Sequence, residues 1–452
     1  SLYLYVNAAV VAGVHALYHP LRLLGVFEGT STPYWLFFAA SRFLNIMLSL
    51  ASIALIIRIG TIAVDRRTGV GAGAVASVLP MHVNMTPPVV PDTLLFLLAI
   101  LSIYLALEHL RGGQNRLYLA AFVAGLAIGT KYMFVAPAAF LTAKWLHDRE
   151  RSQRFWDLRL LASLGACALG FFLATPYALI DAPSYVAGVL FQNSAYSGHP
   201  GNETDNALRY FVSYVFTRGA TPPVFFAFLA GLLLLAATKR RESLVLFCVP
   251  LLWVAILSRY RLKSPHNLVS LSLPIALCAG ALVARIRRNT LAILTAAGLA
   301  VMPIRSDMRR IRSNMKHDLR YKAARWINAN IPPGSTIALE VYSPFPDNEK
   351  FDLVFLGICE FAYVSPDSAR RAGYDYLVAT AHGRFHDYPE RYRNEIATFA
   401  AHLREFETVA TFAPGARHTG RLIRVLKVVP AETPGHVAES TAVASTLIAG
   451  SE

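Results

Sequence analysis

Residues 78–100 read VLPMHVNMTPPVVPDTLLFLLAI and place one acid, Asp92, directly before an apolar run that continues for most of a membrane span. Three prolines, Pro87, Pro88 and Pro91, lie just upstream. This pattern predicts a helix that begins at the membrane boundary with Asp92 in its first turn, where an acid interacts favourably with the helix dipole. The alternative is a carboxylate that binds a metal or orients a substrate, because ionisable groups at this depth are costly and often functional.

The whole chain is unusually apolar. Of its 452 residues 55% are hydrophobic, and the mean hydropathy is +0.42, which is typical of a membrane protein. The net charge of +15 does not indicate a nucleic-acid partner, because the Lys and Arg residues cluster between apolar runs. Three of the four cysteines lie inside apolar runs, so we expect them to pack as small hydrophobic residues rather than form disulfides.

About ten apolar runs are candidates for membrane spans, although several are shorter than the ~20 residues of a full span. They lie at roughly 34–58, 69–86, 92–109, 117–130, 133–147, 159–176, 222–238, 243–258, 267–285 and 289–303. Every second connection is basic, for example DRRTG (65–69) and KRRE (239–242), which predicts that these connections are cytoplasmic. We therefore expect a polytopic, mostly α-helical protein of the plasma (inner) membrane, with its transmembrane domain at residues 34–304.

The flanking segments differ in composition. Residues 1–33 begin with an apolar stretch interrupted by His15, His19 and Arg22, which predicts an interfacial helix on the outer face. Residues 305–430 alternate between helical and strand patterns, which predicts a small extracytoplasmic α/β domain. Residues 431–452 are small and polar, and we expect a disordered tail.

Two candidate cations lie in or beside the predicted spans. Arg42 lies about eight residues inside the first run, where it is expected to face a polar cavity or an acidic partner, a structural ion pair being the simpler alternative. Lys131 follows a short apolar run and precedes Tyr132 at a predicted outer corner. This pair forms either a charged turn or a cationic site that faces a lipid phosphate.

The segment SRYRLKSPH (258–266) carries Arg259, Arg261 and Lys263 on a side that should be poor in cations. This pattern indicates an anionic ligand, with phosphate the simplest, or attraction to anionic head groups.

Two histidines, His82 and His199, lie in predicted outer loops, where they are either solvated or contact a metal or substrate. The sequence contains no HExxH, CxxC or glycine-rich phosphate loop, so zinc-protease and nucleotide-hydrolase functions lack support.

The order of these segments resembles the membrane-embedded glycosyltransferases with the GT-C fold. The resemblance is strongest to the bacterial dolichyl-phosphate-mannose–protein mannosyltransferase-like group (glycosyltransferase family 39) and its aminoarabinose-transferase relatives. The matching segments are SLYLYVNAAV (1–10), SRFLNIMLSLASIALIIRIG (41–60), LPMHVNMTPPVVPDTLLF (79–96), AGLAIGTKYMFVAPAAF (124–140), ATPYALID (174–181), GHPG (198–201), SRYRLKSPHNLVSLSLPIAL (258–277), AARWINANIPPGSTIALE (323–340) and YDYLVAT (374–380).

This resemblance implies transfer of a sugar from a polyprenyl-phosphate donor to a protein, lipid or glycan acceptor on the extracytoplasmic side, with inversion. Family members carry their catalytic acid in the first outer loop, which is expected to precede residue 1, together with a further span that brings the total to about eleven. Asp92 corresponds to the second acidic position, which organises the donor phosphate directly or through a divalent cation, or contacts the acceptor. The cations and aromatic residue expected to bind the donor phosphate are Lys131, Tyr132, Arg259, Arg261 and Arg42.

Two alternatives remain open from the sequence. A polyprenyl-lipid transporter or flippase would bind similar lipids, but transporters tend to show repeated halves, and no repeat is evident in the sequence. A non-catalytic member that binds lipid-linked sugars is the other alternative. The large C-terminal domain favours the enzyme.

Overall fold

The computed structural model describes residues 1–23, 34–196, 202–314, 317–340, 342–357, 359–380, 382–415 and 418–429. The chain divides into two compact units, Ser1–Ser313 and Asn314–Glu452. The predicted tail at 431–452 lies outside the described residues. The boundary expected near residue 305 falls inside a helix, Asn289–Asn314, that continues the last apolar run.

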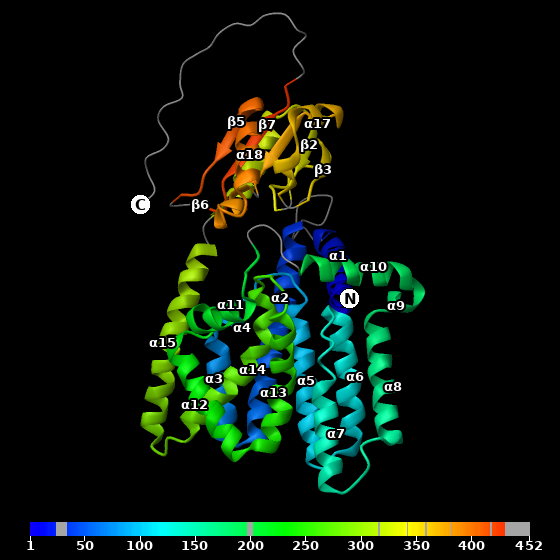
Figure 1. Ribbon diagram of the computed structural model, residues 1–452, viewed down its shortest axis with the longest axis vertical. Coiled ribbons are helices and arrows are strands. Elements are labelled where there is room, and N and C mark those ends of the chain that lie inside the picture. The colour runs from blue at the N-terminus through cyan, green and yellow to red at the C-terminus, as the bar shows by residue number, and fades with distance from the viewer. Residues whose placement is uncertain are drawn as a thin grey trace, which may run out of the picture. The chain divides into compact units, whose positions relative to one another are not determined.

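The first unit is a helical bundle. Its elements are α1 (Leu2–Leu23), α2 (Tyr34–Ala63), α3 (Arg66–Val78), α4 (Pro80–Val83), α5 (Asp92–Leu110), α6 (Gln114–Lys131), α7 (Ala138–Glu150), α8 (Leu158–Ala174), α9 (Tyr177–Ile180), α10 (Ala182–Ala195), α11 (Ala207–Tyr214), the π-helix η1 (Val215–Gly219), α12 (Pro222–Thr238), α13 (Arg240–Leu257), the 3-10 helix η2 (Pro265–Leu271), α14 (Ser272–Ala284) and α15 (Asn289–Asn314). The helices α1, α4, α10 and α11 lie near one end of the bundle (Figure 1).

Most of the predicted apolar runs fall on one helix of this unit each, and α5 begins at Asp92, as the sequence predicts. The predicted run 69–86 is instead divided between α3 and α4, and the run 267–285 between η2 and α14. Within the described residues, four helices are long and apolar enough to cross a membrane: Leu36–Ala63, Asp92–Leu110, Pro265–Ala284 and Asn289–Ser313. A fifth is added if Ala207–Gly219 and Pro222–Thr238, which meet at 116°, form one broken span. The predicted count of about ten spans is therefore not confirmed. Several of the remaining apolar helices are short, such as α8 with 17 residues.

Glycines allow two of these helices to pack with their backbones in contact. In α6 the sequence GLAIG places Gly125 and Gly129 one turn apart, and both face α8. A Cβ added at Gly125 would lie 2.0 Å from the Cys167 carbonyl oxygen, and one added at Gly170 would lie 2.1 Å from the Phe122 carbonyl oxygen. Close backbone approach at small residues is the usual way that helices associate in a bilayer, where lipid tails remove the hydrophobic driving force.

The second unit confirms the predicted α/β domain. It contains β1 (His317–Asp318), α16 (Leu319–Asn330), β2 (Thr336–Leu339), β3 (Asp352–Phe355), η3 (Glu360–Tyr363), α17 (Pro366–Arg371), β4 (Tyr376–Ala379), η4 (His382–Asp387), α18 (Arg393–Glu405), β5 (Glu407–Phe412), β6 (His418–Thr419) and β7 (Ile423–Lys427). The main sheet has the order β3-β2-β4-β7-β5, with β2 parallel to β3 and β4, and β7 antiparallel to β4 and β5.

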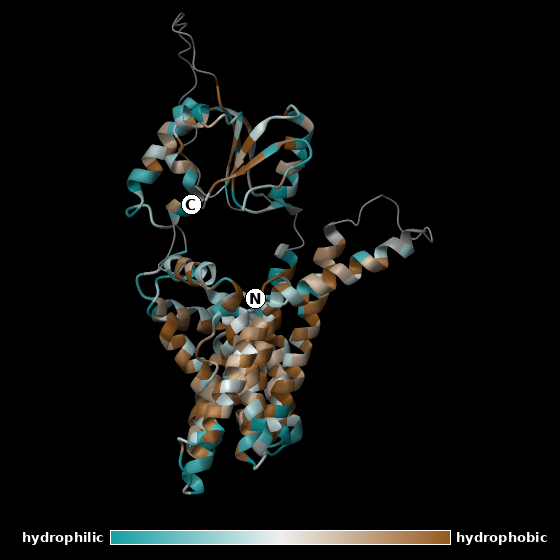
Figure 2. Cartoon of the chain, turned by 90° about the vertical axis from the view of Figure 1, so that its right-hand side faces the viewer, coloured by the Kyte–Doolittle hydropathy of each residue, from teal (hydrophilic) through white to brown (hydrophobic). Residues whose placement is uncertain are grey.

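Alternating side chains of this sheet enter two hydrophobic cores. Ile337, Leu339 and Val378 pack with α16, whereas Ala338 and Leu377 pack with the phenylalanines of η3, η4 and α18. The sheet is thus covered on both faces, which explains why its short strands read as nearly continuous hydrophobic runs. Hydrophobic residues dominate the middle of the helical bundle, and hydrophilic residues dominate the loops at the end opposite α10 (Figure 2).

We expect Gly125→Ala to lower the stability of the helical unit by about 1–3 kcal/mol, because the added methyl group overlaps the α8 backbone and forces the helices apart. Gly165→Ala is the matched control, since a Cβ at Gly165 of α8 meets nothing within 4 Å. Thermal unfolding midpoints of the two variants in the same detergent test this prediction. Equal midpoints would show that the α6–α8 contact does not require the glycine.

Candidate functional site

A cavity of about 450 Å³ lies where several helices of the bundle end together. The ends of α6, α8, α10 and α13 contribute to it, as do the first turn of α1 and the loop before α5. Its lining is amphipathic: aromatic and aliphatic side chains alternate with hydroxyl, amide and ammonium groups. The lining residues are Ser1, Tyr3, Leu4, Val89, Pro91, Gly129, Thr130, Lys131, Tyr132, Phe134, Thr175, Val189, Gln192, Asn193, Tyr196, Trp253, Ile256, Leu257 and Tyr260.

The charged centre of this cavity is an ion pair between Lys131 and Asp92, with 2.5 Å between Lys131 Nζ and Asp92 Oδ1. The Asp92 side chain is 2% exposed and that of Lys131 is 19% exposed, and Lys131 lines the cavity whereas Asp92 does not. Both charges suit their helices, because Asp92 lies in the first turn of α5 and Lys131 in the last turn of α6. The acid therefore serves to hold the cation in place.

A network of neutral hydrogen-bonding groups extends the ion pair. Lys131 Nζ also donates to Asn267 Oδ1 at 2.9 Å, and Asn267 Nδ2 donates to the Tyr196 hydroxyl at 3.1 Å and to Ser264 Oγ at 2.9 Å. Trp253 Nε1 donates to the Asn267 carbonyl oxygen. Burial raises the pKa of the Tyr196 phenol above its usual value, so Tyr196 is protonated at neutral pH and keeps a proton to donate.

Tyr132 has an unusual backbone conformation next to Lys131. It ends α6 in the left-handed region, with φ 52° and ψ 33°. Non-glycine residues rarely adopt positive φ, and such residues are concentrated at functional sites. Its ring stacks on Phe134, with 6.3 Å between centroids, and lies 6.0 Å from Tyr185 of α10. This sharp turn directs α6 to end at the cavity.

Side chains of α2 hold the proline-rich loop that precedes Asp92. Asn45 Nδ2 donates to the Pro88 carbonyl oxygen at 2.5 Å, and Tyr3 donates to Asn45 Oδ1 at 3.4 Å. From the other side, Thr93 Oγ1 donates to the Met85 carbonyl oxygen at 3.1 Å. Asn45 is fully buried, although it lies in a membrane-spanning helix, because these bonds satisfy its amide.

The structure brings three of the predicted site residues together: Asp92, Lys131 and Tyr132. Arg259 and Arg261 are exposed on either side of Tyr260, which does line the cavity. The carbonyl oxygen of Arg261 accepts a hydrogen bond from Thr204 N at 2.6 Å, which ties the cationic segment to the chain that follows α10.

Arg42 and His82 do not line the cavity. Arg42 lies on the exposed face of α2, and the enclosed polar surroundings expected for it belong to Asn45 instead. His82 is 3% exposed and packs between Ser49, 2.8 Å from its Nε2, and the ring of Phe96. His199 lies outside the described residues.

Sequence reasoning missed the cavity residues Tyr196, Trp253 and Tyr260. It also missed Asn267, which is buried and accepts a hydrogen bond from Lys131 but does not line the cavity. The available signal was the polar SPHN sequence (264–267) at the start of an apolar run, where Asn267 faces inward at the membrane boundary. Within the part of the chain that the structure describes, no group of three or more His, Cys, Asp or Glu residues could hold a metal ion.

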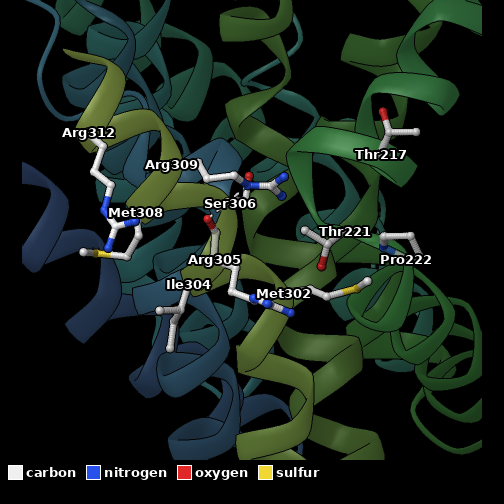
Figure 3. Close-up of a pocket in the computed structure, with 10 residues that line it drawn as sticks. All are labelled: Thr217, Thr221, Pro222, Met302, Ile304, Arg305, Ser306, Met308, Arg309 and Arg312. Atoms are coloured by element: carbon white, nitrogen blue, oxygen red, sulfur yellow. Dashed lines mark hydrogen bonds between the residues drawn. The ribbon is translucent and has the colours of Figure 1, made fainter. Parts of the chain in front are cut away.

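A second cavity, of about 720 Å³, lies between α15 and the bend that joins η1 to α12 (Figure 3). Arg305, Arg309 and Arg312 follow one face of α15 at spacings of four and three residues. Arg305 and Arg309 extend toward the segment that carries Thr217 and Thr221 (Figure 3). None of these residues was predicted as a site residue, although the arginine spacing was visible in the sequence.

Thr221 is strained at this bend. Its φ of 74° and ψ of 152° lie in a region that only glycine adopts readily, and a threonine there costs about 1–3 kcal/mol. Its hydroxyl is buried and has no hydrogen-bond partner among the described residues.

We expect Thr221→Gly to stabilise the helical unit by about 0.5–2 kcal/mol, because it relieves the strain at the cost of some chain entropy and removes no capping bond of α12. Thr217→Gly is the control and should destabilise, because Thr217 lies inside η1. The thermal unfolding midpoints of the two variants and wild type, measured in the same detergent, test this prediction. A loss of stability in both variants would contradict the strain at Thr221.

The ion pair predicts a specific pattern of coupling. Asp92→Asn alone should cost about 3 kcal/mol, the low end of the range for buried pairs, because it leaves the Lys131 charge without its partner. The double variant Asp92→Asn/Lys131→Met should be more stable than the sum of the single effects by about 1–3 kcal/mol. A complete double-mutant cycle of unfolding free energies measures this coupling, and strictly additive effects would show that the pair is not energetically linked.

Comparison with known proteins agrees with this architecture. Residues 38–180 match the family described as dolichyl-phosphate-mannose-protein mannosyltransferase. No curated protein sequence matches the chain significantly.

Among solved structures, ArnT from Cupriavidus metallidurans bound to undecaprenyl phosphate is similar with a TM-score of 0.50 and 13% identity, over 87% of this chain and 84% of that one. The Archaeoglobus fulgidus oligosaccharyltransferase tethered with an acceptor peptide is similar with a TM-score of 0.53 and 12% identity. That match covers 94% of this chain but 65% of the oligosaccharyltransferase. The resemblance indicated by the sequence is thus confirmed: the chain is a multi-pass membrane protein with the GT-C fold of membrane-embedded glycosyltransferases, and its residues 38–180 carry the mannosyltransferase family match.

Proposed function

We propose that the protein transfers a sugar from a polyprenyl-phosphate donor to an acceptor, with the donor phosphate bound by Lys131 in the cavity of about 450 Å³. The observation that carries this proposal is the position of the Lys131 ammonium group, which the buried Asp92 holds at the cavity surface. A cation that is already oriented loses little entropy when it binds a phosphate, and its attraction strengthens as charge grows on the leaving phosphate.

The lining of the cavity suits a lipid phosphate. Tyr132 and Tyr260 line the cavity with Lys131, and Tyr260 donates to Asn193 Oδ1 at 2.8 Å. Apolar side chains such as Trp253 and Ile256 line the remainder and match the isoprenoid part of the donor. Arg259 and Arg261 are exposed beside Tyr260, where they would attract the anionic head group before it reaches Lys131.

In this reaction the acceptor hydroxyl attacks the anomeric carbon, the bond from that carbon to the phosphate oxygen breaks, and a base takes the hydroxyl proton. Asp92 is poorly placed to be that base, because its carboxylate is buried and bound to Lys131. We therefore propose that Asp92 positions the phosphate-binding cation. A protein, lipid or glycan is proposed as acceptor. The proposal also allows a divalent cation to bind the donor phosphate.

The same proposal places the cavity and the C-terminal unit on the extracytoplasmic side of the plasma (inner) membrane. The basic connections, such as 65–69 and 239–242, join helices at the end of the bundle opposite Lys131. Positive charge in short loops favours the cytoplasm, so the cavity end faces outward.

The fold and the comparisons support this proposal. The similar ArnT structure is described with undecaprenyl phosphate, and the similar oligosaccharyltransferase with an acceptor peptide. The competing proposals, a lipid transporter and a non-catalytic lipid binder, would use the same cavity. Only release of the polyprenyl phosphate distinguishes the enzyme from them.

We expect Lys131→Gln to weaken binding of undecaprenyl phosphate about 10- to 100-fold, because it removes one charged hydrogen bond to the phosphate. Arg154→Gln is the matched control: it removes an exposed cation from the loop at the opposite end of α8 and should leave the affinity unchanged. Equilibrium binding to protein in lipid nanodiscs measures both. Equal affinities for wild type and Lys131→Gln would remove this residue from the phosphate site.

Turnover is tested with labelled polyprenyl-phosphate hexose and the protein in proteoliposomes that contain candidate acceptors. The transferase proposal is supported if wild type and Arg154→Gln release the lipid phosphate and Lys131→Gln does not. Movement of the lipid across the bilayer without release of its phosphate would instead identify a transporter.

A further inference from the structure

The C-terminal unit contains its own cavity, of about 230 Å³, at one edge of the main sheet. It is lined by Asp318, Arg320, Tyr342, Thr380, Arg384, Gly420, Arg421 and Ile423. The parallel strands β2 and β4 both end here, since Tyr342 follows β2 and Thr380 directly follows β4. In open α/β sheets, ligands usually bind beyond the carboxyl ends of parallel strands.

Positive charge dominates this cavity. Three arginines come from separate segments: Arg320 from the first turn of α16, Arg384 from η4, and Arg421 from the loop between β6 and β7. The one carboxylate of the lining, Asp318, is 2.5 Å from Arg320. This contact lowers the pKa of Asp318 and raises that of Arg320, so both groups are charged at neutral pH.

A carboxylate outside the lining, Glu340, belongs to the internal structure of the domain. Glu340, 2% exposed, accepts hydrogen bonds from Thr380 N at 2.8 Å and from Phe361 N at 3.3 Å. It thereby fixes the backbone at the end of β4, next to the cavity. Ser343, 3.1 Å from the Thr380 hydroxyl, holds the same corner from the β2 side. The lining thus gathers three arginines and one carboxylate, Asp318, at this edge of the sheet.

An exposed aromatic ring completes the cavity. Tyr342 is 58% exposed, and the Arg384 guanidinium group lies 5.0 Å from the centre of its ring. Stacking on an aromatic ring holds the planar guanidinium group and leaves its N–H groups available for a carboxylate or phosphate. The exposed part of the tyrosine ring offers a flat apolar surface beside these donors. A charged sugar has matching groups, because the C–H face of its ring can pack on the tyrosine and its anionic group can accept from the guanidinium N–H groups.

We propose that this cavity binds an anionic saccharide, with Arg384 and Arg421 on its carboxylate or phosphate group and Tyr342 against its sugar ring. Arg320 adds positive charge, and Asp318 orients Arg320 through their ion pair. The inference goes beyond the proposed function, because it assigns a separate ligand site to the C-terminal unit and requires neither Lys131 nor the lipid donor.

The experiment titrates the purified full chain with galacturonate, with the neutral sugar galactose and with inorganic phosphate, using calorimetry. We expect galacturonate to bind at least about 10-fold more tightly than galactose, and Arg384→Gln or Arg421→Gln each to weaken galacturonate binding about 10-fold. Tyr342→Ala should weaken galacturonate binding but leave phosphate binding nearly unchanged. Arg404→Gln, on the exposed face of α18, is the matched control and should bind as wild type does.

Three results would overturn the proposal: no preference for galacturonate over galactose, an equal loss in Arg404→Gln, or loss of binding in Lys131→Gln, which would place the ligand in the helical unit. Conversely, Lys131→Gln that loses lipid-phosphate binding but keeps galacturonate binding would separate the two sites. The failure of either proposal is therefore visible without the other.

Discussion

A buried carboxylate that holds a single ammonium group at a membrane-boundary cavity is the interaction on which the helical unit depends. Asp92 and Lys131 lie at the beginning of α5 and the end of α6, so the pair fixes how these two helices meet. Removal of either charge would leave the other in a poorly solvated position, which makes the pair costly to break. Under the proposed function, the same pair orients the cation before the donor phosphate binds.

The surroundings of the pair show why the site lies where helices end. Helix ends leave backbone groups without partners, and polar side chains that satisfy them tend to collect there. Asn45 bonds the loop before α5, Asn267 joins Lys131 to Tyr196, and Tyr132 turns the chain sharply after α6. Between these ends, apolar helices pack through close contacts such as Gly125 against α8, which keeps the bundle rigid without polar groups.

The cavities of the two units differ in polarity. The cavity of the helical unit is amphipathic and carries one buried, paired cation, which suits a lipid phosphate. The cavity of the C-terminal unit is smaller and carries three arginines beside an aromatic ring, which suits a charged, water-soluble sugar. Under the two proposals, the unlike polarity of the cavities separates a lipid-linked ligand from a polar one.

The sequence alone determined the positions of the apolar helices, the alternating helix and strand patterns of the C-terminal unit, and the helix start at Asp92, because periodicity and local charge preferences act over a few residues. It also identified Lys131 and Tyr132 as candidate site residues at a helix end. The tertiary structure decided that Asp92 binds Lys131, that Asn267 and Tyr196 join them, and that Asn45 rather than Arg42 faces the interior. These contacts join residues that are 39 to 136 positions apart, and such pairings depend on how whole helices pack, which no local pattern records.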